Sequence, residues 1–235
     1  MIALAIDTAT SATVVGLMLP DGTVREARDD VEAGQRPRHT ARLLPLAAGL
    51  LDGAGLRWHD LELIAVGLGP GTFTGLRIGI ATARGLAAST GAPLVGVGTL
   101  RALASAAAGG GRVLGVIDAR RGEVFVAGYD DGREAIPPSA LAPAAVAGLT
   151  DRPGWLAVGD GALRFRQDLE GGGLIVAPDR SPCHLVSSAA ILQLAVDGRV
   201  DARGSVLPIY VRLPDAELAR RRADTADLAL PGAAS

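Results

Sequence analysis

The stretch GLGPGTFTGLRIGIATAR, residues 67–84, follows the apolar run Leu61–Val66 and predicts a strand, a glycine-rich turn and a helix. The Gly69–Gly71 segment interrupts the periodicity of both elements. The hydroxyls of Thr72 and Thr74 can cap backbone N–H groups at the start of the helix, where the macrodipole adds about half a positive charge. A turn of this kind in an α/β protein either receives a phosphate or caps itself.

A stripe of small residues continues along the predicted helix at every fourth position: Gly75, Gly79, Ala83 and Ala87. Each glycine costs a helix about 0.5 to 1 kcal/mol relative to alanine, so the bare face requires a compensating close contact. The spacing allows two partners for that face, the chain's own sheet or a helix of another protein.

The composition limits the classes of function. The chain has 235 residues, of which 49% are hydrophobic and 20% charged, and this suits one large or two modest globular domains. A net charge of −2 provides no global attraction to nucleic acid. Because Cys183 is the single cysteine and the first residues do not have the pattern of a signal peptide, we expect a cytoplasmic protein.

The sequence contains no lysine, and all 23 basic residues are arginine. This excludes a P-loop lysine, a Schiff base and a kinase-type strand lysine.

The first half predicts a βββαβα order followed by a further strand and helix. We expect strands at 2–6, 13–19, 23–27, 61–67 and 94–97, and helices at 38–54, 74–89 and 99–108. Pro45 should kink the first of these helices or mark a late start.

The pattern of the second half restarts that of the first after a hinge that we expect at Gly109–Gly111. We expect strands at 113–118, 123–129, 156–159 and 174–177, helices near 161–169 and 185–197, and irregular structure over 133–154. Asp118 ends the first of these strands as Asp7 ends strand one, although no sequence identity supports a repeat. The prediction is an α/β protein with domains at 1–108 and 109–212. The last helix of the second domain packs either on its own domain or back on the first domain. A partly disordered tail follows at 213–235.

Each half is predicted to begin with a strand meander and to continue with alternating helices and strands, an order that resembles the actin, hexokinase and Hsp70-like (ASKHA) fold. Specific motifs resemble the TsaB family. The motifs are IDTAT at 6–10, RHTARLLPL at 38–46, GLGPGTFTGLRIGIATARGLA at 67–87, IDARRGEVF at 117–125 and PIYVR at 208–212. Thr10 and Thr72 stand where serine is common in that family, and Phe125 replaces a usual tyrosine. These departures conserve the hydroxyl or lose only a phenol.

The resemblance implies a non-catalytic scaffold subunit that is an inactive paralogue of TsaD. Such a subunit pairs with a TsaD-type transferase, is joined by a TsaE-type ATPase, and supports formation of N6-threonylcarbamoyladenosine at position 37 of tRNAs that read ANN codons. It implies no cofactor of its own, since ATP and metal belong to the partner subunits. It also implies contact with tRNA only through the complex, and homodimers when the partner is absent.

The histidines agree with a chain that holds no metal. TsaD-like proteins bind a metal through an HxxxH pair on the first helix, whereas here His39 is followed by Leu43. A single histidine before a helix is more often a cap or a surface residue. The neighbouring Cys183 and His184 do not indicate a catalytic dyad, because side chains at i and i+1 diverge.

The resemblance places the partner surface on the first two long helices. The candidate partner-binding residues are Leu43, Leu46, Leu50, Thr74, Arg77, Ile78, Ala81 and Arg84. The alternative is that the leucines face the chain's own sheet.

A second candidate site, for nucleotide, follows from the ATP-binding relatives of the fold. Its residues are Asp7, Thr8, Thr10, Gly69 and Gly71. The alternative is an Asx or ST turn that closes the first hairpin. The turn Asp118–Arg121 is either a charged hairpin with an internal Asp–Arg pair or a site of unassigned role.

Two other classes of function stay open. A stand-alone ATP-dependent small-molecule kinase of the same fold would need an acidic base and tight ATP binding. A dinucleotide enzyme is suggested by Gly67-x-Gly69-x-x-Thr72, but the third glycine is missing and no acidic residue occurs over 77–108 to hold a ribose.

Overall fold

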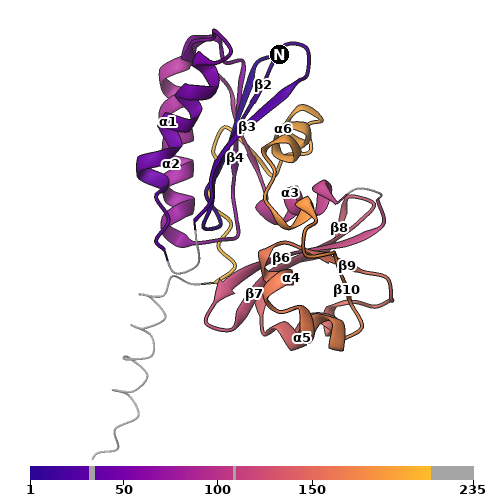
Figure 1. Cartoon of the computed structure of the whole chain (residues 1–235). Helices are drawn as coiled ribbons and strands as arrows, with labels where there is room; N and C mark the ends of the chain where they lie inside the picture. The colour runs from indigo at the N-terminus through magenta and orange to yellow at the C-terminus, as the bar shows by residue number, and fades with distance from the viewer. Residues whose placement is uncertain (32–34, 108–109, 213–235) are drawn as a thin grey trace, which may run out of the picture.

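A computed structural model describes residues 1–31, 35–107 and 110–212, in two sheets (Figure 1). The predicted tail at 213–235 and the proposed boundary at 108/109 lie outside these residues. None of the described helices has the length and apolarity needed to cross a membrane.

The first sheet has six strands in the order β11-β5-β4-β1-β2-β3. Its strands are β1 (Ala3–Asp7), β2 (Thr13–Met18), β3 (Val24–Asp29), β4 (Leu63–Gly67), β5 (Leu94–Val97) and β11 (Ala202–Arg203). β1, β2 and β3 form an antiparallel meander, whereas β4 runs parallel to β1 and β5 parallel to β4. Every residue of β1 and β2 is buried, because helices cover both faces of this sheet.

The second sheet repeats this topology with five strands in the order β10-β9-β6-β7-β8. Its strands are β6 (Arg112–Arg120), β7 (Glu123–Asp130), β8 (Arg133–Leu141), β9 (Leu156–Val158) and β10 (Ile175–Val176). Again three strands form a meander and two follow in parallel. The structural echo that Asp7 and Asp118 suggested is therefore confirmed in the strand order.

The prediction of irregular structure over 133–154 is wrong for its first part, where β8 forms an edge strand. Pro137 and Pro138 are tolerated there, since an edge strand needs no hydrogen-bond donors on its outer side. The pairing of β7 with β8 is irregular between Val126 and Gly128. A 3₁₀ segment, η2 (Pro143–Leu149), follows.

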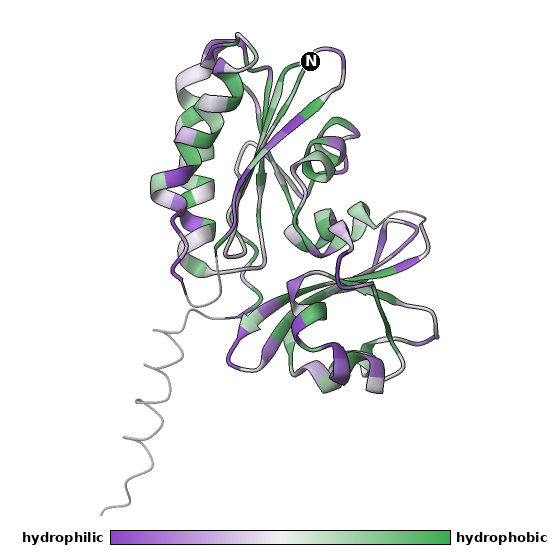
Figure 2. Cartoon of the chain, in the orientation of Figure 1, coloured by the Kyte–Doolittle hydropathy of each residue, from purple (hydrophilic) through white to green (hydrophobic). Residues whose placement is uncertain are grey.

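Helices form three further layers. α1 (His39–Asp52) and α2 (Phe73–Thr90) lie side by side on one face of the first sheet, and α1 continues through Pro45 from a start well before it. α3 (Thr99–Ala106) and α6 (Ser188–Val196) lie on the opposite face, between the two sheets. α4 (Asp160–Arg164) and α5 (Arg166–Gly171) cover the second sheet, so the single helix predicted at 161–169 is divided at Phe165. Figure 2 shows hydrophobic residues concentrated on the strands and on α6.

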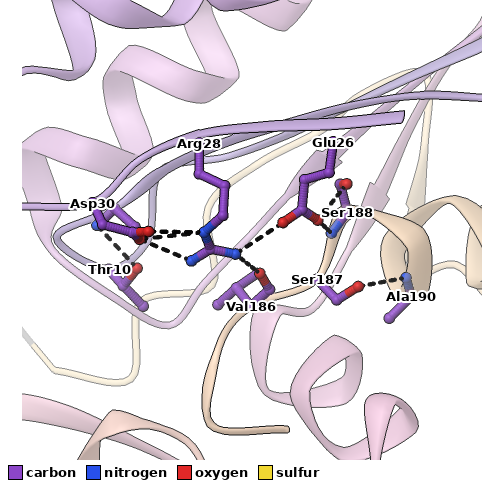
Figure 3. A network of polar contacts seen from close by, with 9 residues as sticks. Thr10, Glu26, Arg28, Asp30, Val186, Ser187, Ser188 and Ala190 are labelled. Carbon is purple, nitrogen blue, oxygen red and sulfur yellow. Dashed lines mark hydrogen bonds and ion pairs between the residues drawn. The ribbon is translucent and has the colours of Figure 1, made fainter. Parts of the chain in front are cut away.

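A polar network attaches the start of α6 to β3 (Figure 3). The Glu26 carboxylate accepts hydrogen bonds from the Ser188 N–H at 2.8 Å and the Ser188 hydroxyl at 2.6 Å. Arg28 donates to the Val186 carbonyl at 2.9 Å and pairs with Glu26 at 3.0 Å. Glu26 thus places a negative charge at the positive end of a helix that arrives from the second sheet, and this fixes α6 on the first sheet.

Residues 204–212, which we call the strap, return from β11 across both halves. The Ile209 N–H donates to the Leu68 carbonyl at 2.8 Å, beside the end of β4. Arg212 then binds Glu123 at 2.6 Å and the Ala119 carbonyl at 3.1 Å in the second half. The PIYVR motif therefore connects the glycine-rich turn with the β6–β7 hairpin.

Candidate functional site

The small-residue stripe of α2 packs against the chain's own first sheet. A Cβ atom built on Gly75 would lie 2.1 Å from the Thr8 carbonyl oxygen, and one on Gly79 would lie 2.3 Å from Thr8 Oγ1. Ala83 is fully buried in the same core. Of the two partners that the spacing allowed, the internal sheet is the correct one.

The glycine-rich turn between β4 and α2 is closed by backbone groups of the same chain. The Thr72 N–H donates to the Ala9 carbonyl at 2.8 Å, and the Thr99 N–H donates to the Gly69 carbonyl at 2.8 Å. The Gly69 N–H in turn donates to Thr99 Oγ1 at 3.1 Å. The Thr72 side chain makes no capping bond, so the predicted hydroxyl cap is wrong at this residue.

Asp7 and Thr8 point into the protein. The two oxygens of the fully buried Asp7 carboxylate accept the Ala9 N–H at 2.8 Å and the Thr99 hydroxyl at 2.7 Å. The Thr8 hydroxyl donates to the Gly75 carbonyl at 2.7 Å. The Asx turn that the sequence offered as an alternative is confirmed. Nucleotide binding by this group of residues stays a prediction. It would require the Asp7 and Thr8 side chains to give up these internal hydrogen bonds and contact the nucleotide instead.

Burial raises the pKa of Asp7 to about 6, against the lowering effect of its hydrogen bonds to Ala9 and Thr99. The folded protein therefore holds the Asp7 proton more tightly than the unfolded chain. Stability from this group is complete at pH below about 4 and is lost as pH rises to about 6.

We predict that Asp7→Asn, which imitates the protonated carboxyl, is more stable than the wild type at pH 7 by up to about 3 kcal/mol. The advantage should shrink as pH falls from about 6 and disappear below about pH 3, where the wild-type carboxyl is protonated in both states. Urea unfolding of both proteins across this pH range measures the difference, and parallel stability curves would contradict the assignment.

His39 is neither a cap nor a surface residue, which corrects the expectation from the sequence. His39 is 4% exposed and its Nδ1 lies 2.9 Å from Thr13 Oγ1, with its pKa lowered by burial. The buried His184 contacts the carbonyls of Gly159 and Ala177 at 3.0 and 3.1 Å. Over residues 1–31, 35–107 and 110–212, no three histidine, cysteine or acidic side chains gather as a metal site would require.

The predicted partner-binding residues divide into an inner and an outer group. Leu43 is 1% exposed and packs with Ala47 and Leu51 against the sheet, so it is part of the core and does not face a partner. Leu46, Leu50 and Ile78 are half-buried at the edge of that core. The remaining four are exposed on α2: Thr74, Arg77, Ala81 and Arg84.

The two arginines of α2 have contacts within the chain. The Arg77 guanidinium lies 3.9 Å from the centre of the Phe73 ring, which packs on Tyr210 of the strap at 5.5 Å. Arg84 donates to the Val206 carbonyl. Arg84 therefore holds the strap against α2 directly, whereas Arg77 packs on the Phe73 ring that contacts the strap.

An apolar groove of about 620 Å³ opens between α1, α2 and η1 (Trp58–Asp60). Its lining residues are Leu44, Pro45, Ala48, Trp58, His59, Leu86, Ser89 and Thr90. Leu44 is 46% exposed there, within a contiguous and largely apolar lining. The sequence prediction missed this groove, although Leu44 and Ala48 share a helical face one position away from the buried Leu43 and Ala47.

Comparison with known proteins gives matches along most of the chain. The family model described as "TsaD: tRNA N6-adenosine threonylcarbamoyltransferase" matches residues 33–166. The chain is 46% identical over 130 residues to the tRNA threonylcarbamoyladenosine biosynthesis protein TsaB of Escherichia coli (strain K12), an alignment that spans 54% of each protein. The chain thus spans about half the length of this relative.

Other relatives are covered more fully. A protein of Mycobacterium tuberculosis (strain ATCC 25618 / H37Rv) is 37% identical over 219 residues, which is 91% of this chain and 93% of the relative. The structure of YeaZ from Pseudomonas aeruginosa superposes with a TM-score of 0.73 at 30% identity, covering 89% of this chain and 99% of YeaZ. A ROK hexokinase from Thermus thermophilus shares the fold alone, with a TM-score of 0.52 at 15% identity over 83% of this chain and all (100%) of the hexokinase. The α/β fold of the actin and hexokinase type is thereby confirmed, and the chain belongs to the TsaB (YeaZ) family.

Proposed function

We propose that this chain is a non-catalytic subunit that pairs with a TsaD-type transferase and supports formation of N6-threonylcarbamoyladenosine at position 37 of tRNAs reading ANN codons. The choice of this tRNA modification rests on its curated relatives, which are named as tRNA threonylcarbamoyladenosine biosynthesis proteins. The observation that carries the pairing is the apolar groove between α1 and α2, with Leu44 and Trp58 in its lining.

The transferase itself is the occupant that fits this groove best. The family model of the transferase matches residues 33–166, a range that contains α1 and α2, so the partner has a corresponding pair of helices. Two such pairs can pack face to face as a four-helix layer, each covering the apolar residues of the other. A homodimer would use the same face when the partner is absent.

A non-catalytic role is consistent with the chemistry of the turns near Asp7. The carboxylate and the neighbouring Thr8 hydroxyl are engaged by the chain's own groups, and Cys183 is buried. In this proposal ATP and metal are bound by the transferase and by a TsaE-type ATPase, and the modification takes place in the cytoplasm.

Reconstitution tests the proposal. The transferase and the ATPase from the same genome are mixed with an unmodified ANN-reading tRNA and a threonylcarbamoyl donor, with and without the chain. We expect modified tRNA only when the chain is present, and equal support from Asp7→Asn and Cys183→Ser. Loss of product with either variant, while the complex still forms, would contradict the non-catalytic role.

A further inference from the structure

A cavity of about 280 Å³, which we call the junction cavity, lies where the two halves of the chain meet. Its lining comes from α3, the start of β6, the end of β7, the β7–β8 turn and Arg199 after α6. A cavity of about 150 Å³ is enough to hold a benzene molecule, so this one has room for a ring with a substituent. None of its described lining residues belongs to the apolar groove, to the glycine-rich turn or to the Asp7 group.

The Tyr129 hydroxyl is a polar group of the junction cavity that lacks a partner. Tyr129 lines the cavity and is 4% exposed, yet its hydroxyl makes no hydrogen bond within residues 1–31, 35–107 and 110–212. The hydroxyls of buried tyrosines usually find a partner. The oxygen is not sealed within the core, so it opens into the cavity. Burial raises the pKa of Tyr129, so the hydroxyl keeps its proton at neutral pH and can donate a hydrogen bond.

Arg101 lies over the Tyr129 ring, and its charge is already paired. The guanidinium carbon lies 5.2 Å from the centre of the ring. Nη2 of the same group lies 3.1 Å from Asp201 and 3.8 Å from Glu134. A cationic ligand next to this ring would be repelled by the guanidinium that already occupies the position.

Exposed polar residues mark the mouth of the junction cavity: Ser105, Asp131 and Arg199. Asp131 Oδ1 accepts the Gly111 N–H at 2.8 Å, and Arg199 donates to the Gly132 carbonyl at 2.6 Å. Arg101 and Arg199 thus stand against the carboxylates of Asp131, Asp201 and Glu134. Positive charge does not exceed negative charge here, so the cavity does not favour an anion.

We infer that the junction cavity binds a small neutral molecule in which an apolar body about the size of a benzene ring carries a carbonyl oxygen. The carbonyl oxygen accepts a hydrogen bond from Tyr129, whose hydroxyl then gains the partner that the described chain does not supply. The apolar body packs on Ala104, Ala107 and Val113, which line the cavity and are buried. This site is separate from pairing with the transferase and does not depend on it.

The first test observes Tyr129 directly in the full chain. The sequence has two tyrosines, so labelling with fluorotyrosine gives two fluorine NMR signals, which the Tyr210→Phe variant assigns. We expect benzamide to shift the Tyr129 signal with a Kd of about 1 mM or lower, as a ligand of its size can reach. Benzoate has the same shape and a negative charge, and it should bind at least about tenfold more weakly.

Three variants locate the bound benzamide by saturation-transfer NMR titration. Tyr129→Phe removes only the hydroxyl and should weaken binding about tenfold. Tyr210→Phe is the matched control, because it makes the same change in a tyrosine of the strap that is 46% exposed, and it should bind like the wild type. Ser105→Trp places a large ring at the mouth from an exposed helix position and should abolish binding.

Unfolding of the free proteins in urea separates a binding role of the hydroxyl from a structural one. Because the Tyr129 hydroxyl has no partner within the described chain, Tyr129→Phe should be at least as stable as the wild type. Lower stability of this variant would show that the hydroxyl is bonded inside the protein and would overturn the inference.

Three results of the binding experiments would also overturn it. The Tyr129 signal would stay unchanged up to the solubility limit of benzamide if the cavity held only water. Equal affinity for benzoate would contradict the preference for a neutral molecule. Undiminished binding by Ser105→Trp would show that benzamide occupies another part of the protein.

Discussion

Replacing Gly75 by alanine is expected to destabilise the protein by about 3 kcal/mol. The new Cβ atom would meet the Thr8 carbonyl oxygen at 2.1 Å and Thr72 Oγ1 at 2.5 Å. Thr8 follows the last residue of β1, so its backbone cannot move without disturbing the hydrogen bonds of Asp7 beside it. Relief therefore requires that α2 move away from the sheet.

The matched control lies in the same helix. A Cβ atom on Gly85 meets nothing within 4 Å, so Gly85→Ala should stabilise the protein by about 0.5 to 1 kcal/mol through helix propensity alone. Urea unfolding of both variants measures the contrast. If Gly75→Ala were as stable as the wild type, the packing of α2 on β1 described above would be incorrect.

Replacing Leu44 by arginine is expected to weaken pairing with the transferase about 100-fold or more. Leu44 lines the groove at 46% exposure, so the change places an unpaired charge in an apolar contact and does not open the core. Ile78, one of the partner-binding residues predicted from the sequence, is half-buried against the chain's own core, and its replacement would also affect folding.

Ile175→Arg is the control for this experiment. Ile175 is an exposed aliphatic residue, at 55%, but lies on β10 in the second sheet. Isothermal titration should give the wild-type affinity for this control and no measurable heat for Leu44→Arg. Equal affinities for the two variants would exclude the groove as the contact.

The local signals in the sequence predicted most elements of the fold. The break in periodicity at Gly69–Gly71 placed the turn, and the apolar runs placed the strands on either side of it. Two strands were missed. The first, β8, contains two prolines, and its identity depends on an edge position that only the assembled sheet defines. β11 has two residues and is held by pairing with β5, a contact distant in sequence.

The sites were harder to predict because they depend on helix orientation and on distant contacts. Spacing shows that α2 has a bare face but not what covers it. Leu43 and Leu44 are adjacent and equally apolar, yet the first is core and the second lines a groove, since helix rotation separates them. Arg164 Nη1 lies 2.8 Å from the Asp118 carboxylate only in the folded chain, so the sequence indicated the Asp–Arg pair within the hairpin but not this contact.

The pairing with a TsaD-type transferase is the central claim, and the molar mass of the mixture tests it most directly. The purified chain and the transferase from the same genome are combined and analysed by size-exclusion chromatography with light scattering. We expect one species with the summed mass of one copy of each protein. Separate elution of the two proteins, with and without nucleotide, would contradict it and would favour a stand-alone kinase of the same fold.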